Sequence, residues 1–599
     1  MTLQRRRILL LAAGATAWSL LILARLAQIQ ILRHDEYVLR AVRQQERTVT
    51  LTPMRGSILD RRGRLLAESV TARSIYADPQ TVQDPAAVAL ALSRVDGLPV
   101  DRQALERRLA RKGEFAWIAR QVEDDVWSAV EMLDLPGIHA LDEHRRTYPN
   151  GTLGSGLLGW VGIDGEGLAG VEHSLNRFVR GTPGVVTLLR DARKGMYLVG
   201  ADGASTAVDG HDIYLTLDEV IQHIAERSLR KTVERYGAKS GSVVVLDPSD
   251  GAILAMASWP TFDPNHFGNF PTTHWRNRVV QDVYEPGSTF KVVTAAAALE
   301  EGVVTPSQII DCGEGFIEIA NTRIREHDNK QFGLLSFEQV LAQSSNVGTI
   351  EVARTLGEKR LDQYARRFGF GSRTGVELPG EASGILRPVN RWSALSTASI
   401  SIGQEIAVTP LQMTAAMAVV ANGGRQVRPH IVERVVDGEG NVVYSPPPAP
   451  TVRVISEKSA AVLNEMLKNV VTLGTGREAA LAEHVVAGKT GTAQKAGPGG
   501  YLPNKTVASF AGYVPADRPR LAILVVIDEP KGSGYGGAVA APAFREIAEA
   551  SLRYLEVAPG FPRRELRLDG RIKLAELSQP SSPGAVSPAV QGEAVGRLP

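Results

Sequence analysis

The sequence predicts an α/β protein with more than one mixed (α+β) domain, held at a membrane by an N-terminal helix. Three observations lead to this prediction. The 599 residues exceed one ordinary folding core, because a domain usually takes roughly 100–200 residues. An uncharged run at residues 8–24 directly follows three arginines. Further along, β-rich runs alternate with runs of helical spacing.

Composition places the chain among folded proteins and argues against nucleic-acid binding. Hydrophobic residues make up 44% and charged residues 22%, which is the globular range. The 67 basic and 65 acidic residues leave a net charge of +2, so no global field would hold a polyanion. Cys312 is the one cysteine of the sequence, which excludes an intrachain disulfide.

A loose group of metal-ligand residue types lies in the middle of the chain. Cys312, Glu314, His327 and Asp328 could in principle hold zinc, yet their spacing matches no known ligand pattern. The alternative is a buried thiol beside polar loop residues. The sequence therefore predicts no metal and no other cofactor.

The N-terminal run is interpreted as a membrane anchor. Residues 8–24 form a helix of about 25 Å at ~1.5 Å per residue, within the usual range of about 17–25 residues for a span. The arginines at 5–7 should stay in the cytoplasm, which puts the chain after Arg25 outside the inner membrane. A cleaved signal peptide is the alternative, with small residues at 13–17 as cleavage sites. The apolar run continues to Leu23, which favours the uncleaved anchor.

The region after the anchor reads as an α+β module without a recognisable active site. Residues 26–46 have helical spacing, and residues 48–79 form short β-like pieces with a turn at Arg62-Gly63. Residues 84–133 are rich in helix formers, and residues 148–184 are rich in glycine.

A second boundary is expected near Asp209. A strand at 213–217 leads to a helix at 219–236, with Asp218 as its N-cap. Several later elements complete the domain: a hairpin of residues 242–246 and 252–258, paired strands at 507–514 and 521–527, and a closing helix at 541–555. One sheet should therefore draw strands from both ends of this domain.

The strongest chemical signal is Ser288-Thr289-Phe290-Lys291. If Gly287 turns the chain and Ser288 opens the helix at 292–300, Lys291 lies on the same face of that helix. A serine needs a base to take its proton, and a lysine that is kept neutral by burial can serve. Alone, the pattern is more often a cap serine with a surface lysine.

Two further motifs follow in order within the same expected domain. Ser344-Ser345-Asn346 alone would be a turn or cap, and Lys489-Thr490-Gly491-Thr492 alone would be an edge strand or loop. The ordered set of three is typical of serine acyl-enzyme sites. Residues 485–488 predict a strand leading to Lys489, and Gly491 would let the backbone approach a ligand closely.

From the anchor to about residue 555 the chain resembles a class B penicillin-binding protein. The resemblance rests on the three motifs and on pedestal motifs at Arg55-Gly56, Asp60-Arg61-Arg62-Gly63, Arg146 with Tyr148-Pro149, Gly170-Val171-Glu172, and Gly181 with Gly184. It implies an elongated, dimerisation-like pedestal and a penicillin-binding transpeptidase domain with an antiparallel sheet flanked by helices.

The resulting domain plan has five parts. It comprises a cytoplasmic N-terminus (1–7), the anchor and the start of a juxtamembrane helix (8–31), the pedestal (32–208), the transpeptidase domain (209–557), and a mostly disordered tail (558–599).

The resemblance also implies roles for the motif residues. Ser288 attacks the penultimate D-Ala carbonyl of a stem peptide, with Lys291 as base, and the terminal D-Ala leaves. Ser344 passes a proton to the leaving amine, Asn346 holds a substrate amide, and Lys489 supplies positive charge.

In the same family pattern, the strand motif binds substrate. Thr490 and Thr492 hold the peptide carboxylate beside Gly491. The backbone N–H groups of Ser288 and Thr492 form the oxyanion hole, a contribution of typically ~3–4 kcal/mol. The Glu-x-x-Leu-Asn signature of class A β-lactamases is missing from residues 377–388, so the acyl-enzyme formed with penicillin should persist.

Within the class, local runs resemble the septal, division-specific FtsI-type branch: Ser344-Ser345-Asn346-Val347-Gly348, Tyr76-Ala77-Asp78-Pro79 and Tyr535-Gly536-Gly537-Ala538. An elongation-type transpeptidase remains an alternative, and so does a β-lactam sensor or division scaffold that needs no turnover. The expected partners are peptidoglycan stem peptides, β-lactams as inhibitors, an FtsW-type membrane glycosyltransferase and division-complex proteins.

Overall fold

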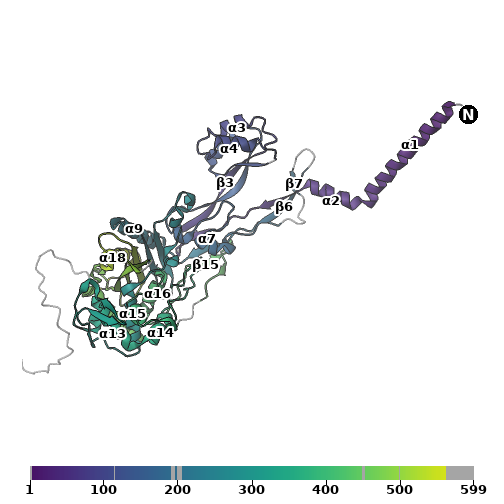
Figure 1. The fold of residues 1–599 in the computed structure, drawn as a ribbon. Coiled ribbons are helices and arrows are strands. Elements are labelled where there is room, and N and C mark those ends of the chain that lie inside the picture. Colours follow the sequence, from purple (N-terminus) through teal and green to yellow (C-terminus); the bar gives the residue numbers. More distant parts are fainter. Residues whose placement is uncertain are drawn as a thin grey trace, which may run out of the picture. The chain divides into compact units, whose positions relative to one another are not determined.

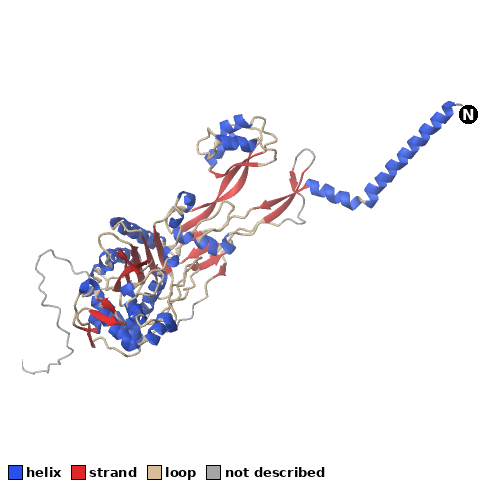
Figure 2. Cartoon of the chain, in the orientation of Figure 1, coloured by secondary structure: helices blue, strands red, loops and turns tan. Residues whose placement is uncertain are grey.

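A computed structural model describes residues 3–113, 115–190, 196–198, 205–447, 452–497 and 500–560. Figure 1 follows these residues from the N-terminus to the last helix, and Figure 2 separates helices from strands. Residues 561–599, which hold nearly all of the expected tail, lie outside the described part.

The N-terminal segment is helical, as predicted. Helix α1 (Leu3–Ala27) passes through a π-helical turn (Gln28–Leu32) into helix α2 (His34–Gln45). The stretch Leu3–Leu32 is long and apolar enough to cross a membrane, with a mean hydropathy of 1.9 over its most apolar window. None of that window is buried against the rest of the chain. The helix therefore offers its apolar surface to a surrounding medium, as a membrane anchor does.

The pedestal is built on a seven-stranded sheet. The predicted turn at Arg62-Gly63 joins β2 to β3, and Gly63 takes a positive φ of 79° there. The strand order is β16-β15-β8-β2-β3-β4, with β5 also paired to β3. Strands β8, β15 and β16 follow Asp209, so this sheet joins residues on both sides of the expected boundary. The strands are β2 (Ile58–Leu59), β3 (Leu65–Ala77), β4 (Ala116–Val122), β5 (Ile138–Thr147), β8 (Asp212–Leu215), β15 (Val432–Val436) and β16 (Val442–Tyr444).

One end of this sheet carries a small helical layer with its own core. Residues 84–133 form helices α3 (Pro85–Leu92), α4 (Arg102–Leu109) and α5 (Asp124–Glu131), and strand β4 interrupts them. Asp84 and Asp101 cap the first two helices by accepting backbone N–H bonds. Apolar side chains such as Ile75, Leu92 and Leu105 pack between helices and sheet.

Three of the pedestal motifs meet in a buried ion cluster around Glu172, whose side chain is fully buried. Arg55 Nη2 lies 2.6 Å from Glu172 Oε2, and Arg146 Nε lies 2.6 Å from Oε1. Arg146 also donates to the carbonyl of Gly56 at 2.7 Å. Tyr148 donates its hydroxyl to Glu172 Oε1 at 3.3 Å. Three sequence motifs that lie far apart in the chain are thus one structural unit.

A five-stranded antiparallel sheet organises the C-terminal domain. Its order is β10-β9-β19-β18-β17, so strands from residues 240–259 lie beside strands from residues 487–528. This confirms the prediction that one sheet draws strands from both ends of the domain. The strands are β9 (Ser240–Leu246), β10 (Ile253–Trp259), β17 (Ala487–Gly497), β18 (Gly500–Val514) and β19 (Leu521–Asp528).

Helices cover both faces of this sheet. On one face, α9 (Glu219–Arg235) and α18 (Gly536–Tyr554) enclose a second apolar core. Asp218 caps α9, as predicted, by accepting from the backbone N–H of Val220 at 3.1 Å. The closing helix begins at Gly536, earlier than expected.

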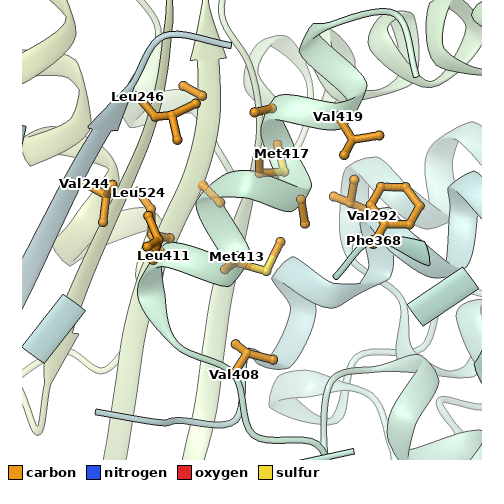
Figure 3. Close-up of a cluster of buried hydrophobic side chains, with 14 of the residues drawn as sticks. Val244, Leu246, Val292, Phe368, Val408, Leu411, Met413, Met417, Val419 and Leu524 are labelled. Atoms are coloured by element: carbon orange, nitrogen blue, oxygen red, sulfur yellow. The ribbon is translucent and has the colours of Figure 1, made fainter. Parts of the chain in front are cut away.

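The other face packs against α16 (Pro410–Ala421), a helix buried on all sides. Figure 3 shows Leu411 of α16 beside Val244 and Leu524 of the sheet, and Val419 toward Val292 of helix α11 (Lys291–Glu300). Each such side chain contributes about 1.5–3 kcal/mol when fully buried. Helix α16 therefore fixes α11, whose first residue is Lys291, relative to the sheet.

Candidate active site

The Ser-x-x-Lys motif lies at the start of α11. Gly287 has a φ of 54°, and its N–H donates to the carbonyl of Gly403 at 3.0 Å. From Gly287 a 3₁₀ turn (Gly287–Phe290) leads into α11. Ser288 sits in this turn and is half-buried. The left-handed glycine thus turns the chain before the serine, as the sequence predicted.

Lys291 is completely buried and points toward the second motif. Its Nζ donates to the carbonyl of Ser344 and to Asn346 Oδ1, both at 2.7 Å, and lies 3.4 Å from Ser344 Oγ. The Ser288 hydroxyl makes no hydrogen bond within the described part of the chain.

Lys489 approaches the same serine from the other side. It is also completely buried, and its Nζ donates to Ser344 Oγ at 2.8 Å and to the carbonyl of Thr490 at 3.1 Å. Both lysines are therefore within hydrogen-bond distance of one hydroxyl. This arrangement gives a continuous path for a proton between Lys291, Ser344 and Lys489.

Burial controls the protonation of the two lysines. Loss of solvent lowers the pKa of Lys291 to about 7, against the opposing pull of the Glu326 carboxylate. Burial, and then the charge of Lys291, also lower the pKa of Lys489 well below its usual value. Neither lysine forms an ion pair among the described residues. A neutral amine can take a proton from a nearby hydroxyl, which is what a serine nucleophile requires.

The second motif connects two helices, α12 (Phe337–Gln343) and α13 (Asn346–Leu356). Ser344 lies between them with a φ of 61°, a left-handed conformation that is rare for residues other than glycine. Ser345 caps α13, because its hydroxyl accepts from the N–H of Gly348 at 3.0 Å. The tight turn aims the Ser344 side chain at the lysines.

The third motif lies on β17, the edge strand of the five-stranded sheet. A Cβ added at Gly491 would come 2.2 Å from Ser509 Oγ and 2.9 Å from Thr289 Cγ2. Glycine at this position therefore lets the strand lie against the turn that holds the serine. Thr492 Oγ1 accepts from the N–H of Gly536 at 3.1 Å.

A pocket of about 460 Å³ opens where the three motifs meet. The eight residues predicted for the site all lie at this place. Ser288, Ser344, Asn346, Thr490 and Thr492 line the pocket. Lys291, Lys489 and Gly491 lie buried behind its wall.

Sequence reasoning missed other residues of this wall. Glu326 lines the pocket and is 3% exposed. Thr475 Oγ1 lies 2.6 Å from Thr490 Oγ1, and the Tyr535 hydroxyl donates to Asp328 at 2.5 Å across the rim. Asp328 and Tyr535 belong to stretches that the sequence had singled out for other reasons, but no local pattern places them, Glu326 or Thr475 at this pocket, because they come from separate loops.

The candidate zinc ligands Cys312, Glu314, His327 and Asp328 do not form a metal-binding geometry. Cys312 is buried, with its sulfur 3.4 Å from the Ser345 hydroxyl, while His327 and Asp328 are exposed. Across the described residues, no group of three or more His, Cys, Asp or Glu side chains could hold a metal ion.

A half-buried serine in front of two buried lysines, beside a threonine-lined edge strand, defines a serine acyltransferase site. Two family descriptions match this chain: the penicillin binding protein transpeptidase domain over residues 241–549, and the penicillin-binding protein dimerisation domain over residues 50–215. The chain belongs to the class B penicillin-binding proteins, and it is a D,D-transpeptidase.

Relatives and solved structures cover most of the chain. Stage V sporulation protein D of Bacillus subtilis is 35% identical, over 93% of this chain and 87% of its own. Peptidoglycan D,D-transpeptidase FtsI of Escherichia coli is also 35% identical, over 90% of each chain. Penicillin binding protein 3 of Mycobacterium tuberculosis, solved with aztreonam, has a TM-score of 0.68 at 29% identity, and covers 86% of this chain and 99% of its own.

Proposed function

We propose that this D,D-transpeptidase cross-links peptidoglycan stem peptides of the division septum through an acyl-enzyme on Ser288. The observation that carries the proposal is the meeting of three sequence motifs at one pocket, with Ser344 bonded to two buried lysines. The relatives add support, since FtsI of Escherichia coli is a peptidoglycan D,D-transpeptidase.

In the proposed acylation, Ser288 Oγ attacks the carbonyl of the penultimate D-Ala, and its proton moves to neutral Lys291. The tetrahedral intermediate then collapses, the C–N bond breaks, and the terminal D-Ala amine takes a proton from Ser344. Ser344 recovers its proton from the lysines that contact it, Lys291 and Lys489. Protons and electrons balance without any cofactor.

The strand motif is proposed to orient the peptide. The hydroxyls of Thr490 and Thr492 are placed to bind its terminal carboxylate at the pocket wall. The backbone N–H groups of Ser288 and Thr492 are the proposed oxyanion hole. In support, a Cβ added at Gly287 would lie 3.2 Å from the carbonyl oxygen of Thr492, so the strand and the serine turn are close.

Deacylation is proposed to use an amine of a second stem peptide rather than water. Glu381, which stands in the region where a class A β-lactamase has its deacylating glutamate, accepts hydrogen bonds from the backbone N–H groups of Thr374 and Gly375. Its side chain is 7% exposed and holds a loop. We therefore expect β-lactams to form a long-lived acyl-enzyme, in keeping with the solved relative that holds aztreonam.

The division role is the finer part of the proposal. It is supported by the runs at residues 76–79, 344–348 and 535–538, which resemble the septal branch. Stage V sporulation protein D has the same identity as FtsI, so the cellular role needs its own test. We also propose that the stretch Leu3–Leu32 anchors the chain with its catalytic domain outside the cytoplasmic membrane, beside an FtsW-type glycosyltransferase that supplies glycan strands.

The nucleophile is tested by intact-mass spectrometry of the full chain in detergent with a fluorescent penicillin. We expect one stable adduct on the wild type and none on Ser288→Ala. Ser228 offers a matched control, because it begins a second Ser-x-x-Lys pattern but is buried in α9, and Lys231 is exposed. Ser228→Ala should therefore keep the adduct. An adduct that persists in Ser288→Ala would contradict the proposal.

The cellular role is tested by depletion and complementation in the native host. A septal enzyme should leave filaments on depletion, whereas an elongation enzyme should leave swollen or rounded cells. Ser288→Ala should fail to restore division. Restoration by Ser288→Ala would instead favour a scaffold or sensor that needs no turnover.

A further inference from the structure

Glu326 stands behind the second motif at the end of a short hairpin. The hairpin consists of β12 (Phe316–Ile319) and β13 (Thr322–Arg325), and Glu326 follows directly. Its N–H donates to the carbonyl of Gly315 at 2.8 Å, and its side chain is 3% exposed. A carboxylate buried this deeply needs several donors or a cation nearby.

Three donors from the first turn of α13 converge on this carboxylate. Oε2 accepts from the N–H of Asn346 at 2.6 Å. Oε1 accepts from the N–H of Val347 at 3.1 Å and from the Ser345 hydroxyl. The N-terminus of a helix attracts negative charge, and hydrogen bonds to a charged acceptor are the stronger kind. The helix start, and with it the second motif, is therefore held by Glu326.

The neighbouring carbonyl of Arg325 orients the Asn346 side chain. Asn346 Nδ2 donates to this carbonyl at 2.9 Å, which leaves Oδ1 to accept from Lys291 Nζ at 2.7 Å. Ser344, one residue before the held turn, has a strained left-handed backbone. Such a conformation persists when the residues around it are fixed, and here Glu326 fixes those on its C-terminal side.

Glu326 is also the carboxylate whose charge acts on the buried Lys291. The ionisable groups that act on Lys291 are Glu326 and the Cys312 thiol. Of these, Glu326 has the larger effect and raises the pKa of Lys291. It therefore favours the protonated form of Lys291, in opposition to burial, which lowers the pKa of that lysine. The charge of Lys291 acts in turn on Lys489 of β17.

We propose that Glu326 is a positioning residue of the acylation site, which holds the Ser344–Asn346 turn in place and supplies a counter-charge beside Lys291. This inference rests on the roles proposed above for Lys291 and Ser344. Glu326 touches no reacting atom in this scheme and acts through the residues that do.

The test compares Glu326→Gln and Glu326→Asp by the rate of acylation with a fluorescent penicillin, measured on the full chain from about pH 5.5 to pH 9. Loss of the charged hydrogen bonds should slow Glu326→Gln by roughly 10- to 100-fold. The acid limb of its pH–rate profile should also move to lower pH, because the carboxylate that favours protonated Lys291 is lost. Glu326→Asp keeps the charge, so its acid limb should stay at the wild-type position.

Glu318→Gln is the matched control, because Glu318 lies on the same hairpin, is 60% exposed and pairs with exposed Arg323. It should acylate like the wild type. A folded Glu326→Gln variant with the wild-type rate and acid limb would overturn the inference. If that variant does not fold, a folded Glu326→Asp variant with a displaced acid limb would overturn it instead. The assignment of Ser288 as nucleophile has its own test, because an adduct on Ser288→Ala would contradict it.

Discussion

The molecule buries charge in two places, in opposite ways. In the pedestal, the carboxylate of Glu172 pairs with Arg55 and Arg146 at 2.6 Å each. In the transpeptidase domain, Lys291 and Lys489 are as deeply buried but are bonded to hydroxyl, amide and carbonyl oxygens. The ion pairs of the pedestal cluster join three segments of the chain and so hold the structure together. Burial without an ion pair disfavours the charged form of both lysines, which lowers the pKa of each and favours the neutral amine that can accept a proton.

The largest expected effect is that of Lys291→Met on acylation. Removal of a general base typically costs about 10²- to 10⁴-fold in rate. The melting temperature should stay the same or rise, because a buried, unpaired amine is replaced by an apolar chain of similar length. Stopped-flow acylation and thermal unfolding measure the two effects.

Lys231→Met is the control for that change, since Lys231 is 64% exposed and forms a surface pair with Glu546. It should alter neither quantity appreciably. A strong loss of stability in Lys291→Met would mean that the active-site lysine is structural, like the pedestal arginines.

The reverse result is expected for Glu172→Gln. Breaking a buried ion cluster by removing one partner costs about 3–5 kcal/mol, because both arginines lose their counter-charge. The melting temperature should fall, while the rate of acylation per folded molecule stays unchanged. Glu549→Gln removes an exposed pair with Arg553 and should cost less than about 0.5 kcal/mol. Equal melting temperatures for the two variants would contradict the contrast.

Gly491→Ala should reduce acylation without a change of charge. The new methyl group would overlap Ser509 Oγ and push β17 away from the serine turn. A displacement of about 1 Å at a reacting centre can cost roughly 100-fold in rate. Gly438→Ala is the control, since its added methyl group meets no atom within 4 Å. An unaffected rate in Gly491→Ala would show that the strand position is not critical.

The pH dependence separates the two regions further. With the pKa of Lys291 at about 7, the acylation rate should fall about tenfold per pH unit below that value. In the unfolded chain this pKa returns to about 10.4, so between about pH 7 and pH 10.4 the unfolded state binds more protons. Stability should therefore rise with pH in that window. Lys489, whose pKa is also lowered, contributes to the rise, so Lys291→Met should make it smaller.

Among the effects considered, Tyr535→Phe should have the smallest. The lost hydrogen bond to Asp328 is between exposed side chains, so the cost should stay below about 1 kcal/mol. Acylation should remain within about twofold of the wild type. A loss of more than tenfold would show that this contact at the rim shapes the pocket.

The sequence predicted what depends on short-range order. Ser288 and Lys291 are one helical turn apart, and the paired strands at 507–514 and 521–527 follow each other directly, so local spacing was enough to place them. The juxtaposition of the three motifs came from resemblance to a family, because spacing alone does not bring residues 288, 344 and 489 together.

The remaining contacts could not be predicted, because they join segments that have no shared pattern. Glu326 follows a hairpin of four-residue strands, and its hydrogen-bond partners come after α12 in the sequence. Gly403 contacts the Gly287 turn across more than a hundred residues. The sheet that joins β8 to β2 crosses the boundary expected at Asp209, since strand pairing does not respect a change in composition.

The strand order of the five-stranded sheet has a consequence for how the enzyme is made. Protein synthesis proceeds from the N-terminus at roughly 5–20 residues per second. Ser288 is therefore made well before β17, β18 and β19. During that delay, β9 has its neighbour β10 but lacks its other partner strand β19, and the wall that carries Lys489 is missing. A nascent or truncated chain that ends before residue 487 carries the reactive serine but has no site in which it can react with a penicillin. The antibiotic target comes into being with the completed molecule.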